Sequence, residues 1–148
     1  MKHYKMKNLE FYKTQKGVGL IEVMVTVLLL STALLSLAVM QKRSLQFNHE
    51  AYLRSQANIL AYDIIDRARA NIDNISGYNI IFTSDAPTGS SQSDTDLREW
   101  LTNISVTLPN GDGQIVCNAT SHFCSVVMRW TEQENDGNPT AFVYETVL

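Results

Sequence analysis

The sequence predicts an α+β protein in which one long N-terminal helix packs on a small antiparallel sheet. An uninterrupted apolar run covers residues 18–40 and carries a single charged residue, Glu22. Apolar residues then recur at spacings of three and four between residues 53 and 72, which is the period of an amphipathic helix. After residue 103, short alternating runs are separated by turn-forming residues, as is typical of antiparallel strands. The 148 residues allow one modest domain beside the apolar run.

Charge is distributed unevenly between the first 17 residues and the rest of the chain. Residues 1–17 contain five lysines and one glutamate, a net charge of +4, and show no apolar periodicity. Since the whole chain carries −3, residues 18–148 carry −7. We expect the basic segment to be a removable leader that stays in the cytoplasm, with the acidic body across the membrane. An acidic body also argues against nucleic acid as a partner, because phosphate contacts need basic patches.

Residues 18–40 predict a membrane-spanning helix. At about 1.5 Å of rise per residue, this helix is long enough to cross a hydrocarbon layer of about 30 Å. Glu22 is costly in such a helix, since an acidic residue at mid-membrane costs about 2.5–3.5 kcal/mol on insertion scales and less near the interface. A residue this costly usually has a partner close by. Small residues in the run permit other helices to approach closely, namely Gly19, Ala33, Ser36 and Ala38.

The start of this run has a distinct pattern, Lys16-Gly17-Val18-Gly19-Leu20-Ile21-Glu22. The pattern resembles the processing and assembly signal of type IV pilins and pseudopilins, and it looks most like that of PilV-type minor pilins. The resemblance implies cleavage after Gly17 by prepilin peptidase and N-methylation of Val18 as the new first residue. It also implies an assembly role for Glu22, the fifth mature residue. Cleavage would create a positive amine four residues from Glu22, on this or a neighbouring subunit, which is the partner that the carboxylate lacks in lipid.

Two positions depart from the usual pattern of that family. Val18 stands where phenylalanine is commonest, a change that the family tolerates. Gly19 stands where threonine or serine is common, and glycine weakens a helix by about 1 kcal/mol relative to alanine.

Two other kinds of N-terminal segment also combine lysines with an apolar run. One is an uncleaved signal anchor, and the other is a secretory signal peptide in which Ser36-Leu37-Ala38 would be the cleavage site. The run is longer than a typical signal-peptide core. Neither alternative explains Glu22 or the glycine that follows Lys16, so the pilin interpretation is preferred.

The helical pattern continues beyond the apolar run. One face is lined by Leu53, Ala57, Leu60, Ile64, Ala68 and Ile72, and we expect it to pack on the sheet. Asp63 with Arg67, and Asp66 with Arg69, are spaced as ion pairs on the helix surface. Ser76-Gly77 predicts the end of the helix. The segment 61–71 also resembles the PilV-type pattern, whereas the resemblance is only loose beyond residue 103.

The remaining residues predict a loop, a short helix and four strands. Residues 85–94 read as a loop, and residues 96–101 as a short helix with Asp94 or Thr95 as its cap. Trp100 is expected to anchor the core. The four predicted strands cover 104–108, 114–117, 124–130 and 141–147, with turns at 109–113 and 135–138.

The only two cysteines, Cys117 and Cys124, are separated by six residues in the part expected to lie outside the cytoplasm. An oxidising compartment favours a disulfide bond between them. The alternative is a metal-binding pair. No second cysteine pair and no suitably spaced histidine accompanies them, although His122 is near Cys124.

The sequence contains no Gly-rich phosphate loop, no HExxH pair, no CxxC and no local nucleophile motif. Asp94 and Asp96 are better read as solvated loop residues than as metal ligands. No catalytic activity, cofactor or metal is therefore expected. The sequons at Asn74, Asn103 and Asn118 matter only in a glycosylating pathway.

The resemblance predicts a minor pilin, a structural or priming subunit of a type IV pilus. The alternatives are a minor pseudopilin of a type II secretion system and a tip-exposed adhesive module. Before assembly the chain is expected in the inner membrane as a single-pass protein, and afterwards in the pilus at the cell surface. Its expected partners are other minor pilins, the major pilin, prepilin peptidase and the inner-membrane assembly platform. The expected parts are a leader (1–17), a membrane and assembly helix (18–40), an amphipathic helix (41–76) and a C-terminal sheet domain (77–148).

Overall fold

The computed structural model describes residues 17–82, 84–132 and 138–148. The chain falls into two compact units, Met1–Arg43 and Ser44–Leu148, and the 51-residue helix α1 (Leu20–Ala70) has residues in both. The expected leader, apart from Gly17, lies outside the described residues, and so does most of the turn predicted at 135–138.

The described part of the first unit is the beginning of α1 and the three residues before it. Every side chain from Val18 to Met40 is exposed. The best 18-residue window of the helix has a mean hydropathy of 2.4, so α1 is long and apolar enough to cross a membrane. An apolar helix surface of this size is stable only in lipid or against other protein chains.

In the second unit, α1 buries one face and then ends earlier than the sequence suggests. The buried residues are Leu53, Ala57, Leu60, Ala61, Ile64, Ile65 and Ala68. The helix ends at Ala70, and a 3₁₀ helix η1 (Ile72–Tyr78) follows it. The predicted end at Ser76-Gly77 is therefore wrong by about two turns. Asn71 has a non-helical backbone (φ −122°, ψ 46°), which breaks the helix before the glycine is reached.

Helix α2 (Gln92–Thr107) replaces two predicted elements, the short helix at 96–101 and the strand at 104–108. Its cap is Ser91, not Asp94 or Thr95. The Ser91 hydroxyl accepts from the Asp94 N–H (3.1 Å), and the Asp94 carboxylate accepts from the Ser91 N–H (3.2 Å), which forms a capping box. The buried positions Leu97, Trp100 and Ile104 are spaced by three and four, so this helical face continues through the residues read as a strand.

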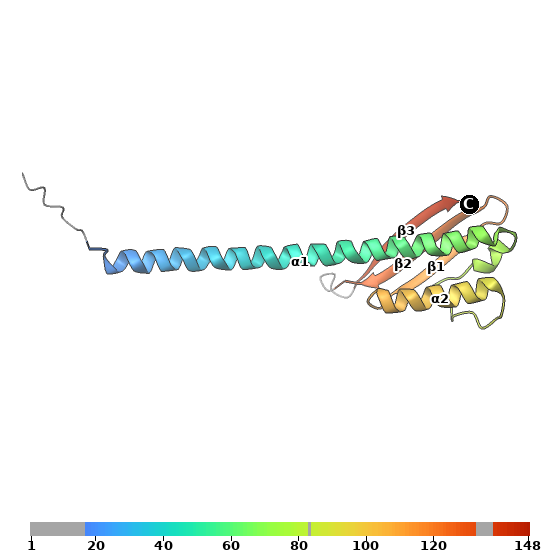
Figure 1. Cartoon of the computed structure of the whole chain (residues 1–148), viewed down its shortest axis with the longest axis horizontal. Coiled ribbons are helices and arrows are strands. Elements are labelled where there is room, and N and C mark those ends of the chain that lie inside the picture. Colours follow the sequence, from blue (N-terminus) through green and yellow to red (C-terminus); the bar gives the residue numbers. More distant parts are fainter. Residues whose placement is uncertain (1–16, 83, 133–137) are drawn as a thin grey trace, which may run out of the picture. The chain divides into compact units, whose positions relative to one another are not determined.

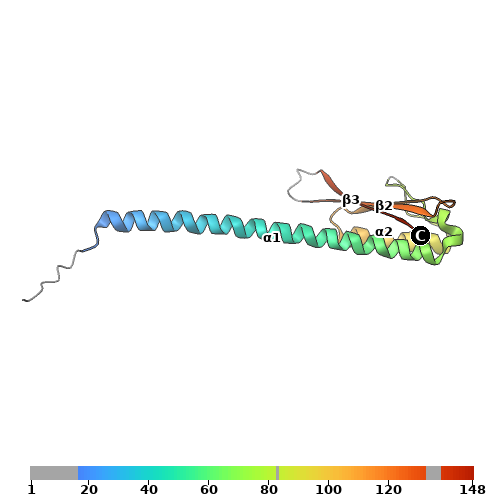
Figure 2. The ribbon, with the colours of Figure 1, turned by 90° about the horizontal axis from the view of Figure 1, so that it is seen from above.

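Three strands form one antiparallel sheet in the order β1-β2-β3: β1 (Asp112–Cys117), β2 (Phe123–Thr131) and β3 (Pro139–Val147). The sequence predicts four strands, but the described residues form only three, because residues 104–107 belong to α2. Figures 1 and 2 show α1 and α2 in one layer on the same face of the sheet. The predicted fold class, a long N-terminal helix on a small antiparallel sheet, is confirmed.

The core of the second unit lies between the helices and the inner face of the sheet. Trp100 is fully buried, and its indole N–H donates to the Leu60 carbonyl (2.9 Å), which ties α2 to α1. The prediction that Trp100 anchors the core is confirmed. The same ring lies over Gly113 of β1, where an added Cβ would come within 2.6 Å of it.

Candidate processing and assembly site

The backbone around Gly19 starts helix α1. Gly17, Val18 and Gly19 precede the helix, and the N–H groups of Glu22 and Val23 both donate to the Gly19 carbonyl (3.0 and 3.3 Å). Gly19 therefore stands just outside the helix, where its flexibility costs less than it would in the interior. The second departure from the family pattern is placed where a helix tolerates it.

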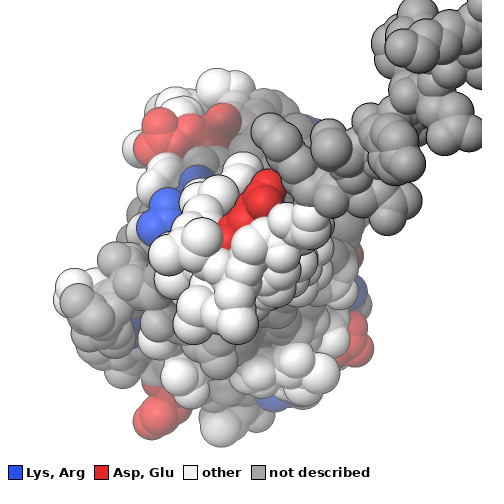
Figure 3. Space-filling model, turned by 90° about the vertical axis from the view of Figure 1, so that its left-hand side faces the viewer, with Lys and Arg blue, Asp and Glu red and all other residues white. Residues whose placement is uncertain are grey.

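Glu22 lies in the first turn of α1. A carboxylate is favoured there because the first backbone N–H groups and the helix dipole present positive charge. Among the described residues, Glu22 forms no ion pair. Figure 3 views the chain from the helix start, where the described surface is white around a small red acidic group.

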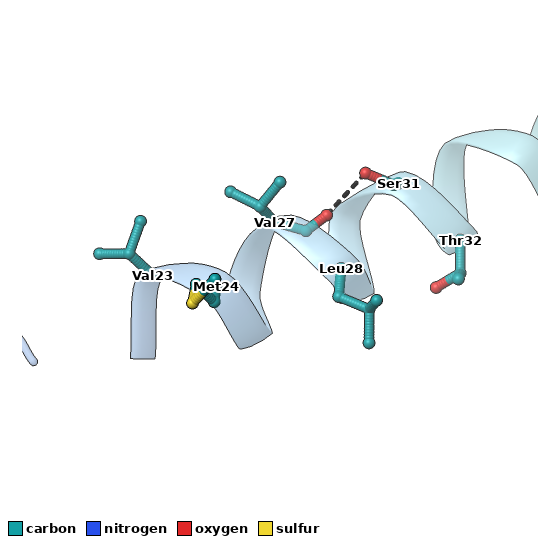
Figure 4. A pocket seen from close by; sticks show the side chains of 6 residues that line it. All are labelled: Val23, Met24, Val27, Leu28, Ser31 and Thr32. Carbon is teal, nitrogen blue, oxygen red and sulfur yellow. Dashed lines mark hydrogen bonds between the residues drawn. The ribbon is translucent and has the colours of Figure 1, made fainter. Parts of the chain in front are cut away.

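The hydroxyl groups within the apolar run are satisfied by the helix itself. Each donates to a carbonyl three or four residues earlier, at 2.7–2.9 Å; the donors are Thr26, Ser31, Thr32 and Ser36. Figure 4 shows the bond from Ser31 to the Val27 carbonyl. Such bonds remove the cost of placing a hydroxyl in lipid. Glu22 is thus the one polar side chain from residue 18 to residue 40 that needs a partner from outside its own helix.

A shallow hollow runs along the same part of the helix (Figure 4) and is lined by Val23, Met24, Val27, Leu28, Ser31 and Thr32. These residues form two rows with a spacing of four along the helix and carry no charge, so the hollow suits an apolar partner such as a lipid chain or another helix. None of the residues that line it carries an acidic or basic side chain.

Cys117 and Cys124 form a disulfide bond in the second unit. They are directly opposite each other on β1 and β2, and both are buried. The bond closes the β1–β2 hairpin. Gly17, Val18 and Glu22 belong to the first unit, so the cysteines form a separate structural feature.

A polar network that sequence reasoning missed links α1, η1 and α2. Arg67 donates to Asp63 (3.1 Å), Asp96 (3.2 Å) and Glu99 (2.8 Å). The buried Asp96 also accepts from the Tyr78 hydroxyl (2.6 Å) and from Gln92. The prediction that Asp96 is a solvated loop residue is therefore wrong, because it lies in α2 and is buried. The pair Asp66–Arg69 forms as predicted, at 2.6 Å.

The network shifts two acid–base equilibria. Burial, and next the hydrogen bond to Asp96, raises the pKa of Tyr78 to about 12. The hydrogen bond to Glu99 is the largest cause that raises the pKa of Arg67 above its ordinary value. These shifts keep the Tyr78 hydroxyl protonated and Arg67 charged, so that both side chains remain donors to their carboxylate partners. The spacing of Asp63 and Arg67 signalled one contact of this network, but nothing local linked them to Asp96.

Residues 12–38 match the prokaryotic N-terminal methylation motif. The chain carries a type IV prepilin-like signal. No curated protein and no solved structure matches the chain significantly. The motif supports a precursor of the type IV pilin or pseudopilin class that prepilin peptidase processes and that assembles with pilus components.

The prepilin-like signal contains Gly17, Val18 and Glu22, and α1 begins within it. A single N-terminal apolar helix is consistent with anchoring of the precursor in a membrane. Proteins of this class are structural subunits. Within the described residues, no group of three or more His, Cys, Asp or Glu side chains is arranged to hold a metal ion.

Proposed function

We propose that this chain is a minor pilin of the PilV type, a structural or priming subunit of a type IV pilus. Prepilin peptidase cuts it after Gly17, and the new N-terminus on Val18 is methylated. The observation that carries the proposal is the isolation of Glu22 in an apolar helix that satisfies its own hydroxyl groups.

The positive amine of a processed subunit is the natural partner of Glu22. Within one chain the pairing is poor, because the amine points along the axis of the first turn. Between subunits, each incoming chain satisfies the carboxylate or the amine of its neighbour. An unpaired carboxylate is costly in lipid or in a dry filament core, so this pairing favours assembly and fixes axial register.

The proposed parts follow from these roles. The leader (1–17) stays in the cytoplasm, the helix 18–40 first spans the inner membrane and then packs in the filament, and 41–76 and 77–148 form the periplasmic body. The partners are other minor pilins, the major pilin, prepilin peptidase and the inner-membrane assembly platform, with no nucleic acid and no cofactor.

Two alternatives make different predictions. A minor pseudopilin of type II secretion shares the processing signal. The neighbouring genes distinguish the two functions, because the gene of a pseudopilin lies beside secretion genes and the gene of a pilin lies beside pilus-assembly genes. A tip-exposed adhesive module for anionic ligands needs a basic patch. Residues 77–148 contain no lysine and only two arginines, Arg98 and Arg129. Both are engaged, Arg98 with the carbonyls of Pro87 and Gly89 and Arg129 with Asp112 (2.9 Å).

A deletion strain tests the proposal when it is scored for surface pili and twitching, with the processed chain sought in sheared pili. We expect fewer pili, restoration by the wild-type gene, and the processed chain in the sheared fraction. Normal piliation with the chain absent from sheared pili would contradict the pilin role. A secretion defect without a piliation defect would favour the pseudopilin.

A further inference from the structure

The two edges of the sheet differ in whether their outward backbone N–H and C=O groups are hydrogen-bonded. The outward N–H and C=O of Ile115 on β1 bond to the backbone of Ile80 (3.0 and 2.9 Å). Those of Cys117 bond to the side chain of Asn79 (2.6 and 3.2 Å). The β1 edge is therefore covered by residues of the same chain.

The β3 edge has an open row of backbone groups. Leu148 N–H donates to the His122 carbonyl (2.9 Å), and the β2–β3 register is continuous from there, so the even-numbered residues of β3 bond to β2. The N–H and C=O groups of the odd-numbered residues point away from the sheet; they belong to Ala141, Val143, Glu145 and Val147. Among the described residues the only bond to this row comes from the Thr146 hydroxyl, which reaches the Val147 carbonyl at 3.2 Å.

Most of the devices that usually protect an exposed edge are missing from this one. The one charged side chain of β3, Glu145, is exposed and accepts from the Ser125 hydroxyl at 3.3 Å. Edge strands are commonly blunted by lysine, by a bulge or by proline in the strand. β3 contains no lysine, pairs with β2 without a bulge and has its proline only at its first position, Pro139. The side chains of Val143 and Val147 on its outer face are 56% and 64% exposed.

Two tyrosine rings lie beside this edge. Tyr62 of α1 packs against Tyr144 of β3, with ring centroids 4.8 Å apart, and Tyr62 remains about half exposed. A strand added beside β3 would place its inner side chains against these rings and its outer side chains against Val143. This arrangement fits a polypeptide segment with alternating apolar residues.

We propose that the β3 edge accepts an extended strand of another subunit, different from this chain, in the same assembly. The proposal rests on the proposed function for the origin of the partner. Two copies joined edge to edge at β3 are related by a two-fold axis normal to the sheet. That axis would direct residue 44 of each copy to opposite sides, whereas two chains anchored in one membrane need residue 44 on the same side. A second copy that offers its β1 edge finds that edge already covered by residues 79–80.

The test uses the full-length chain in its own membrane, with a photo-cross-linking amino acid at Ala141. The control position is Val106 of α2, which is 82% exposed and lies outside the sheet. We expect cross-links from position 141 to a different pilin-type subunit and none from position 106. Cross-links only to a second copy, or none at all, would overturn the proposal.

Two variants at Val143, each made in the chain that carries the cross-linker at position 141, test whether the backbone makes the contact. Val143→Pro removes one outward N–H without touching the β2–β3 ladder, whereas Val143→Thr changes the side chain and keeps the N–H. We expect the cross-link yield to fall at least about tenfold with Val143→Pro, since each lost hydrogen bond and a disrupted edge weaken pairing, and to stay within about twofold with Val143→Thr. Equal yields in the two variants would overturn the proposal.

Hydrogen exchange on the wild-type chain keeps the proposal testable if Val143→Pro misfolds. The amides of Val143 and Glu145 should exchange quickly in the detergent-solubilised chain and at least about tenfold more slowly in the assembly. Those of Phe142 and Tyr144 should be protected in both states. Unchanged exchange at Val143 in an assembly that contains the chain would overturn the edge contact and leave the pilin role intact. If the chain is missing from sheared pili but the proline and threonine variants still differ, the pilin role fails and the edge contact stands.

Discussion

Glu22 is the residue on which assembly is expected to depend. Glu22→Ala should leave cleavage after Gly17 and the folded second unit intact, because Glu22 belongs to the first unit and the core of the second unit is built from residues 53–130. Incorporation into pili should fall sharply, since the neighbour's amine then loses its partner. Glu22→Asp should be partly defective, because a close-packed site feels the loss of one methylene. A processing blot beside the analysis of sheared pili measures both effects.

Glu50→Ala, at an acidic residue farther along α1, is the matched control and should assemble normally. Wild-type amounts of Glu22→Ala in sheared pili would show that Glu22 is not the assembly determinant.

Tyr78 makes the stability of the second unit depend on alkaline pH. Its pKa is raised from 10.0 to about 12 in the folded chain, so the stabilisation is complete below about pH 10 and is lost as the pH rises through 12. Tyr78→Phe should destabilise the full chain by about 1.5–3 kcal/mol near neutral pH, because it removes a hydrogen bond to the charged Asp96. Chemical denaturation in detergent at several pH values measures this.

The difference between wild type and Tyr78→Phe should shrink between pH 10 and 12. Tyr52→Phe, at an exposed tyrosine of α1, is the control and should follow the wild-type curve. A constant difference across this range would mean that the Tyr78 hydroxyl does not titrate as the network requires.

At the scale of elements, the contact between α2 and β1 depends on the lack of a side chain at Gly113. An added Cβ would lie 2.5 Å from Cδ1 of Ile104 and 2.6 Å from the Trp100 ring. Gly113→Ala should therefore destabilise the second unit by about 1–3 kcal/mol, the usual cost of overpacking a core. Thermal unfolding measures the change. Gln114→Ala, on the opposite face of β1, is the control, and an equal effect of the two variants would argue against this packing.

The disulfide should stabilise the β1–β2 hairpin only modestly. A loop of this size is shorter than the 15-residue loop for which about 3 kcal/mol is expected, so the double variant Cys117→Ser/Cys124→Ser should lose less than that. Thiol titration of unreduced protein should detect no free thiol. Two titratable thiols in protein taken from the periplasmic side would contradict the bond.

Some elements were predictable because their signals are long. The face that contains Leu53, Leu60 and Ile64 repeats over many turns, so its period is unambiguous. Ile104, Val106 and Leu108 form only a short alternating run of β-branched and apolar residues, which a strand and the end of a helix share. Packing on Gly113 and Trp100 decides for the helix, and no local pattern contains that information.

The functional residues also differ in how visible they are in the sequence. Gly17 and Glu22 stand in a contiguous pattern within the motif at residues 12–38, and their roles in processing and assembly stay predictions. Asp96 and Tyr78 meet Arg67 across 29 and 11 positions of the chain, and only the folded backbone brings them together. Isolated polar residues in a sequence resemble solvated ones until their burial is known.

For the whole molecule, the central claim concerns the apolar helix of residues 18–40, whose hydroxyl groups bond within the helix and whose only charged side chain is Glu22. We claim that this helix becomes an assembly element after processing. Intact mass together with N-terminal peptide analysis of the membrane form most directly tests the processing step, on which this claim depends. We predict a mature chain that begins at Val18 and carries one added methyl group on its amine. A mature chain that starts at Met1, or near Val39 as a secretory signal peptide would leave it, would contradict the account.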